Sequence, residues 1–299
     1  MRQQFEAIGK SMSWTLAFKE DDTFLLATTG DAKLLDEVRD TCEQSLNRFC
    51  QIFEVSRETL RGKEPFWFLL VMKREDYNGF GQMLAKQHDD PSITQRFERT
   101  SANGCFVCAD PVAGTGTSTQ NMVVHILAHR MLEHYAELHP GGKVPGWVQE
   151  GFAAYLDAYV KEGPRASCLA NVGYEGKSLK ERGQKGNWAA TAHLVVQEYK
   201  EKLKKKEVME TYRGLANMTA KQFDKLSGQE VAVSWHVTTD LVGTKPKKYK
   251  AFLDAVLDGT KQQKAFEKAF GEDLDDYEKS WMKAVLKEAP PESKAKPKK

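Results

Sequence analysis

The chain of 299 residues has no long apolar run and little excess of charge of either sign. No stretch of about 18 consecutive apolar residues is present, so we expect no membrane-spanning helix. The first residues contain no continuous apolar segment like that of a signal peptide, which makes a cytoplasmic location the default expectation. A formal net charge of +2, from 44 basic and 42 acidic residues, argues against a nucleic-acid-coating surface.

Cysteine is also scarce. Five cysteines in a chain of this length do not suggest a disulfide framework; they are Cys42, Cys50, Cys105, Cys108 and Cys168. Cys105 and Cys108 have the C-x-x-C spacing of metal and redox sites. However, their surroundings, GCFVCAD, are typical of a strand, in which positions i and i+3 point to opposite faces. We therefore expect a structural, apolar role for these cysteines.

The first 116 residues alternate between strand and helix patterns. Apolar, β-prone runs predict strands over 23–29, 65–72 and 103–110, and the second run is apolar on both of its faces, as in a strand covered on both sides. Apolar residues at helical spacing predict a helix from Asp31 to Phe53 and another from Tyr77 to Leu84. This order predicts a small sheet with helices packed on it.

Residues 117–160 predict two helices joined by a turn. Thr117 and Gln120 have capping-box spacing and are expected to begin the first helix. PGGKVP supplies the turn, and the second helix is expected to run to about Tyr159. The expected buried stripe of the first helix is Val124, Leu127, Ala128, Met131 and Tyr135.

The remaining chain is predicted to be helical. Residues 163–187 are rich in Gly and Lys and predict a loop, and Gly271 has the pattern of a residue that ends a helix. Helices are expected over 189–203, 219–226, 231–241 and 249–257, followed by segments around Phe266 and Phe270 and from Leu274 to Val285. Lysine clusters at 202–206 and 245–250 are interpreted as solvated helix faces. The predicted class is α+β, with parts at 1–116, 117–160 and 161–289 and a disordered basic tail at 290–299.

His125 and His129 are the candidate metal ligands of the first helix in 117–160. Imidazoles at i and i+4 share one face and can reach the same ion. Glu150, on the returning second helix, is well placed as a third ligand, and a fourth position is left to water. This residue set suits zinc. An isolated H-x-x-x-H pair more often consists of polar residues beside a core helix, but the cap, the turn length and the residues grouped on the second helix favour the metal; that group is Trp147, Glu150, Gly151 and Tyr155.

The two motifs, HILAH and WVQEGFAAY, resemble those of the gluzincin metallopeptidases. That family has H-E-x-x-H on one helix and W-x-x-E-G-x-A-x-Y on the next. The order of elements is similar to peptidase-MA-like domains, in which a late Ser-Trp matches SWHVTTDL at 234–241. The resemblance is specific over roughly residues 104–160. It implies a zincin-like fold with His125, His129 and Glu150 as zinc ligands.

One residue departs from the family pattern. Where gluzincins have the glutamate that serves as general base, this chain has Ile126, which accepts no proton. Loss of a general base typically costs about 10² to 10⁴ in rate. Glu133 has nearly the same angular position but lies about 10 Å further along the helix axis, and Gln149 is not a base. The sequence offers no efficient replacement.

The other histidines carry weaker signals. His134 and His139 are expected to face solvent. His236 is a weak catalytic candidate that could polarise a carbonyl oxygen, although burial beside Trp235 is the commoner outcome for such a residue.

Three functions follow from these observations. The first is a catalytically degenerate, zinc-metallopeptidase-like protein that binds peptide or protein in the former active-site cleft, with retention of the zinc left open. The second is an active zinc hydrolase with an unusual general base. The third is a metal-free interaction module on a zincin scaffold. Metal content separates the third from the other two, and peptide turnover separates the first from the second.

Overall fold

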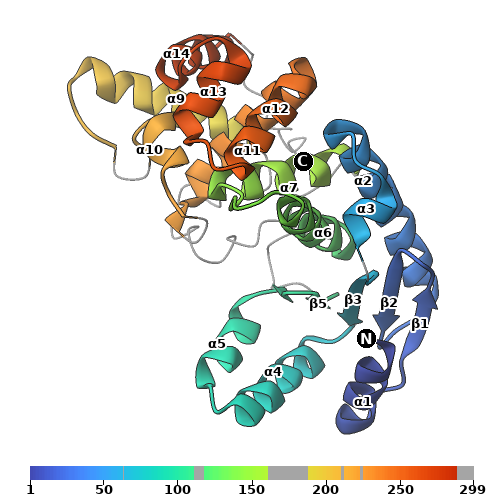
Figure 1. Cartoon of the computed structure of the whole chain (residues 1–299). Coiled ribbons are helices and arrows are strands. Elements are labelled where there is room, and N and C mark those ends of the chain that lie inside the picture. Colours follow the sequence, from blue (N-terminus) through green and yellow to red (C-terminus); the bar gives the residue numbers. More distant parts are fainter. Residues whose placement is uncertain (63, 111–117, 161–187, 210–211, 223–224, 288–299) are drawn as a thin grey trace, which may run out of the picture. The chain divides into compact units, whose positions relative to one another are not determined.

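The computed structural model describes residues 1–62, 64–110, 118–160, 188–209, 212–222 and 225–287 (Figure 1). The chain forms two compact units, one of residues 1–134 and 156–171 and the other of residues 135–155 and 172–299. The division passes through α6 (Thr119–Glu137) and α7 (Gly146–Val160). The class is α+β, as predicted, while the expected part boundaries at 116 and 160 stay predictions.

The first unit contains a five-stranded mixed sheet of order β1-β2-β3-β5-β4. The central strands β2, β3 and β5 are parallel, and β1 and β4 pair antiparallel at the two edges. The strands are β1 (Ala17–Glu20), β2 (Phe24–Thr28), β3 (Phe66–Val71), β4 (Ala102–Asn103) and β5 (Phe106–Cys108). The helices that accompany them before α6 are α1 (Arg2–Met12), α2 (Lys33–Phe53), α3 (Arg57–Arg61), α4 (Arg74–His88) and α5 (Pro91–Arg99).

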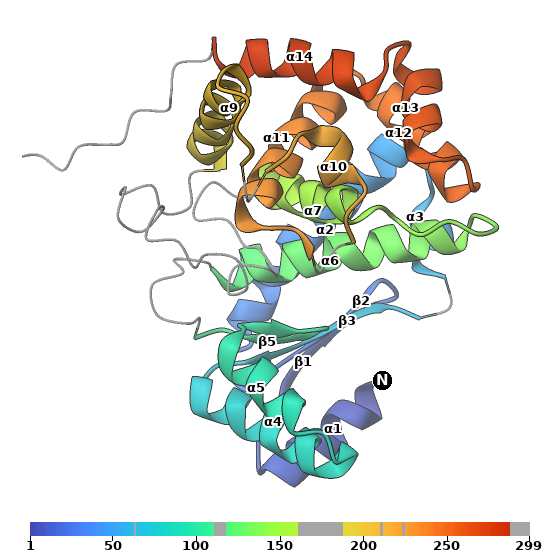
Figure 2. The same cartoon turned by 90° about the vertical axis from the view of Figure 1, so that its left-hand side faces the viewer.

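Helices cover both faces of this sheet. On one face, Leu25 and Leu69 join a core cluster with Phe5 of α1, Phe80 of α4 and Phe97 of α5. The alternate strand residues are also buried on the opposite face, where α2 and α6 lie in Figure 2. The expectation that residues 65–72 form a strand covered on both sides is confirmed.

The strand expected over 103–110 is two strands. Gly104 has a φ of 55° between β4 and β5, and this left-handed conformation, which glycine adopts without steric cost, reverses the chain. The sequence patterns also did not predict α1, β1 or α5. The residues of β1 are only half-buried or exposed, so its apolar pattern is weak, and its pairing with β2 makes it a strand.

The second unit is helical. Its described helices after α7 are α9 (Trp188–Lys204), α10 (Leu215–Thr219), α11 (Gly228–Thr244), α12 (Pro246–Leu257), α13 (Gln262–Phe270) and α14 (Leu274–Val285). Gly271 ends α13 with a φ of 80°, as predicted. The helix expected over 219–226 is wrong, because α10 ends at Thr219 and the described residues 220–222 contain a turn and a bend. The predicted loop at 163–187 and tail at 290–299 lie outside the described residues.

The lysines of the clusters at 202–206 and 245–250 are exposed or partly exposed. Lys202 pairs with Glu207 at 2.6 Å, and Lys250 pairs with Asp254 at 2.6 Å. These contacts agree with the prediction of solvated helix faces. Among the helices that the structure describes, none combines the length and the apolar character needed to cross a membrane.

Candidate metal centre

Helix α6 begins with a hydroxyl cap one residue later than expected. The backbone N–H of Asn121 donates to Ser118 Oγ at 3.1 Å, and the backbone N–H of Met122 donates to the carbonyl of Ser118 at 3.1 Å. Ser118 is therefore the N-cap, whereas the sequence pointed to Thr117 and Gln120. The run Thr117-Ser118-Thr119 offers three hydroxyls in succession, so spacing alone did not select the right one. The predicted buried stripe of α6 is confirmed, with every member less than 5% exposed.

His125 and His129 face one another across one turn of α6. Their Nε2 atoms lie 3.2 Å apart. The ring of His125 is completely buried, and that of His129 is half-buried. In a tetrahedral zinc site with Zn–N bonds of about 2.0–2.1 Å, the two nitrogen atoms lie about 3.3 Å apart. The imidazole pair is therefore spaced like two ligands of one zinc ion.

Glu150 completes a group of three possible ligands. The donor atoms of His125, His129 and Glu150 all lie within 4.8 Å of one another, and Glu150 is completely buried. Buried charges in proteins are paired or coordinate a metal. The two imidazoles and the buried carboxylate could therefore hold a metal ion.

Two residues near Glu150 in the sequence, Trp147 and Gly151, pack α7 against other helices of the second unit. Trp147 is buried, packs beside Phe252 of α12 with the two rings tilted, and donates its indole N–H to Gln262 Oε1 at 3.1 Å. Gly151 lets α11 approach the backbone of α7, because a Cβ at this position would lie 2.6 Å from the carbonyl oxygen of Ser234 and would also contact Thr238. The tryptophan and the glycine of WVQEGFAAY thus fix α7 on the helices of the second unit.

Neither Glu133 nor Gln149 supplies a general base in place of Ile126. Ile126 is 7% exposed and has no proton-accepting atom. Glu133 is exposed and pairs with Arg130 at 2.8 Å, and Gln149 donates to the carbonyl of Val144 at 3.0 Å. The structure therefore agrees with the sequence in offering no carboxylate in the position of the family's glutamate.

Sequence reasoning missed a second buried polar pair on the same two helices. The side-chain amide of Asn121 donates to a carboxylate oxygen of Asp157, and both side chains are at most 2% exposed. Asn121 precedes His125 by one turn, and Asp157 follows Glu150 by two turns. These spacings place each residue on the ligand-bearing face of its helix. The sequence therefore contained this signal, in the helical spacing of Asn121 from His125 and of Asp157 from Glu150.

His134 and His139 do not face solvent as expected. The imidazole of His134 stacks on Phe66, with ring centroids 5.0 Å apart, and its Nδ1 lies 3.0 Å from the carbonyl of Leu60. His139 Nδ1 lies 2.9 Å from Asp258, and Nε2 lies 3.8 Å from Asp254. Neither histidine belongs to the metal-ligand group, and each has a partner in the packing instead.

His236 lies on α11 and contacts Trp281 of α14. The indole N–H of Trp281 donates to His236 Nδ1 at 3.1 Å. In the neutral ring this bond leaves the proton on Nε2, which is the form that polarising a carbonyl oxygen requires. His236 is not a member of the metal-ligand group, and its role near the metal stays a prediction.

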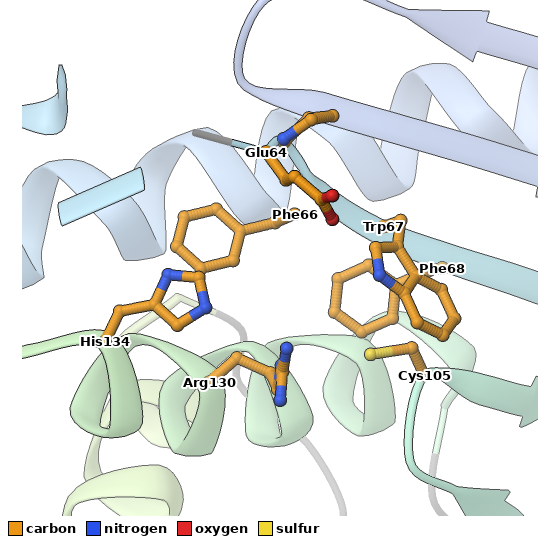
Figure 3. Close-up of a pocket in the computed structure, with 8 residues that line it drawn as sticks. Glu64, Phe66, Trp67, Phe68, Cys105, Arg130 and His134 are labelled. Atoms are coloured by element: carbon orange, nitrogen blue, oxygen red, sulfur yellow. The ribbon is translucent and has the colours of Figure 1, made fainter. Parts of the chain in front are cut away.

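A small pocket lies between α6 and the start of β3 in the first unit (Figure 3). Arg130 and His134 line it from α6, with Glu64, Phe66 and Cys105 on the other side. Burial raises the pKa of the Cys105 thiol to about 11, so it stays protonated at neutral pH and is a poor metal ligand. Cys108 instead packs in the core cluster on the face of the sheet opposite to Cys105. This agrees with the expectation that positions i and i+3 of a strand point to opposite faces.

Comparisons with known proteins add no family to this description. Neither a scan against protein-family models nor a search among curated proteins finds a match.

Proposed function

We propose that this protein is a zinc-binding, metallopeptidase-like protein that binds peptide or protein segments at His125, His129 and Glu150 and lacks efficient hydrolysis. The observation that carries the proposal is the combination of a zinc-like ligand spacing with Ile126 between the two histidines. The ligand residues are those of the gluzincin pattern, while the residue that should take the proton is absent.

Each ligand residue has a defined part in this proposal. His125 and His129 present two neutral nitrogen donors from one helix, and Glu150 supplies a negative charge that offsets the charge of the cation. A zinc ion held by these residues would act as a Lewis acid toward a carbonyl oxygen. A peptide carbonyl could then bind without being cleaved, because Ile126 offers no base to a water molecule.

The proposal is tested with zinc-loaded protein and a mixture of unstructured peptides. We expect the wild type to retain peptides and the His125→Ala/His129→Ala variant to lose that binding, with cleavage by either protein no faster than in buffer containing zinc. Wild-type cleavage that disappears in the double variant would contradict the degenerate reading and identify an active hydrolase. Equal peptide binding by the two proteins would instead indicate an interaction surface that does not need the metal ligands.

A further inference from the structure

The buried hydrogen bond between Asn121 and Asp157 joins the two helices that bear the metal ligands. Both side chains lie in the first unit, although Asp157 is on α7. Asp157 is completely buried, and Asn121 is 2% exposed. A buried carboxylate is costly unless it is hydrogen-bonded, so the amide of Asn121 gives Asp157 a partner that the chain needs in this position.

The cap of α6 also orients the amide of Asn121. Ser118 Oγ accepts from the backbone N–H of Asn121 and donates its own proton to the side-chain oxygen Oδ1. This bond leaves the Nδ2 group of Asn121 directed at Asp157. Ser118, Asn121 and Asp157 therefore form one chain of hydrogen bonds from the first turn of α6 to α7.

The position of this pair relates it to the ligands. Asn121 is four residues before His125, which is about 6 Å along the axis of α6, and Asp157 is seven residues after Glu150, about 10 Å along α7. Both helices are continuous over these intervals. A bond that fixes the level and rotation of one helix against the other at 121 and 157 therefore also restrains the approach of Glu150 to the two histidines.

We propose that Asn121 and Asp157 are positioning residues for the metal centre, and this inference rests on the proposed zinc site. They act through the register of α6 and α7 and do not contact the ion. The orientation of ligands by residues outside the coordination sphere commonly contributes about 10–100-fold to metal affinity. For a pair that acts through the helices we expect an effect near the lower end of that range.

The test uses zinc affinity, measured by competition with a chromophoric chelator, in the full chain. Asn121→Ala removes the bond and is expected to weaken zinc binding about tenfold. The exchanged pair Asn121→Asp/Asp157→Asn restores a donor and an acceptor with the same total charge, and we expect its affinity to lie within about threefold of the wild type. Should Asn121→Ala not fold, the exchanged pair decides the question.

Val38→Ala is the matched control, because Val38 is fully buried on α2 and its loss lowers stability through a cavity. It should leave zinc affinity unchanged, even where its loss of stability equals that of Asn121→Ala. Unchanged affinity in a folded Asn121→Ala variant, or weak binding by a folded exchanged pair, overturns the positioning role while the zinc site stands. Absence of zinc binding in the wild type instead overturns the proposed site and this inference together.

Discussion

The Nε2 atoms of His125 and His129 lie 3.2 Å apart on one face of α6. This distance is close to the edge of a zinc tetrahedron, about 3.3 Å, and it is also within hydrogen-bond range for the two imidazoles. One turn of α6 therefore places the two imidazoles close enough together to be ligands of one metal ion. Glu150 joins them from α7, so the ligand set depends on two helices and a turn between them.

Glu150→Ala should weaken zinc binding strongly, because it removes the one negatively charged ligand. We expect zinc affinity to fall by more than the roughly 10–100-fold that follows the loss of a residue supporting a ligand from outside the coordination sphere. Chelator competition measures it. Glu133→Ala, which removes an exposed carboxylate of α6, is the control and should bind zinc like the wild type. Equal affinity in Glu150→Ala and Glu133→Ala would remove Glu150 from the ligand set.

Ile126→Glu should create or raise zinc-dependent peptidase activity, since it places a carboxylate where the gluzincin pattern that the chain resembles has its general base. A general base contributes about 10² to 10⁴ in rate, so cleavage of a fluorogenic peptide is the measurement. Ile126→Gln has nearly the same size and no basic group, and we expect it to stay inactive. If both variants bind zinc and neither cleaves, the chain lacks more of the catalytic machinery than the glutamate.

Gly151→Ala should destabilise the protein. The added Cβ would meet the carbonyl oxygen of Ser234 and the hydroxyl of Thr238 on α11, and overpacking of this kind costs about 1–3 kcal/mol. Gly243→Ala is a matched control in a helix, because a Cβ at Gly243 meets no atom within 4 Å. It should stabilise the protein by about 0.5–1 kcal/mol. Denaturant unfolding of both variants measures these changes, and a neutral Gly151→Ala would show that α7 and α11 are not closely packed there.

Glu278 should make stability depend on pH. Burial raises the pKa of its carboxyl above the ordinary value of 4.5, even though Tyr212 and the N–H of Leu215 donate to it. A carboxyl whose pKa is raised by folding favours the folded state below its unfolded pKa, and that contribution is lost as the pH rises through the folded pKa.

Wild type should therefore lose unfolding free energy relative to Glu278→Gln as the pH rises above about 4.5, the ordinary pKa of the carboxyl. Glutamine keeps an oxygen that can accept both hydrogen bonds. The measurement is urea unfolding of the two proteins at several pH values. A difference that does not change with pH would show that the carboxyl titrates normally in the folded protein.

The sequence predicted those parts of the fold whose local pattern and tertiary environment agree. The stripe of α6, the strand at 65–72 and the helix end at Gly271 are confirmed because apolar spacing and glycine conformation are local signals. It missed β1, whose half-exposed residues become a strand through pairing with β2. It also missed α5, although Asp90 before Pro91 has the pattern of a helix start, and the structure shows the Asp90 side chain accepting from the N–H of Ser92.

For the candidate site, the sequence predicted the ligand-bearing helices but not what joins them. Helical spacing brought His125 and His129 together, and the return of the second helix alongside the first pointed to Glu150, which the family resemblance also implied. The bond between Asn121 and Asp157 was not foreseen, because it depends on which faces of α6 and α7 meet. Likewise, solvent exposure was the wrong expectation for His139, since its carboxylate partners Asp254 and Asp258 are more than 100 residues away in the chain.

The most direct test of the proposed zinc site is the metal content of untagged, zinc-exposed protein by elemental analysis, with the wild type beside His125→Ala/His129→Ala. The account predicts about one zinc per wild-type chain, the occupancy of a single three-ligand site, and none at that site in a folded double variant. A folded wild type that takes up no metal would contradict it and leave an interaction module without a metal.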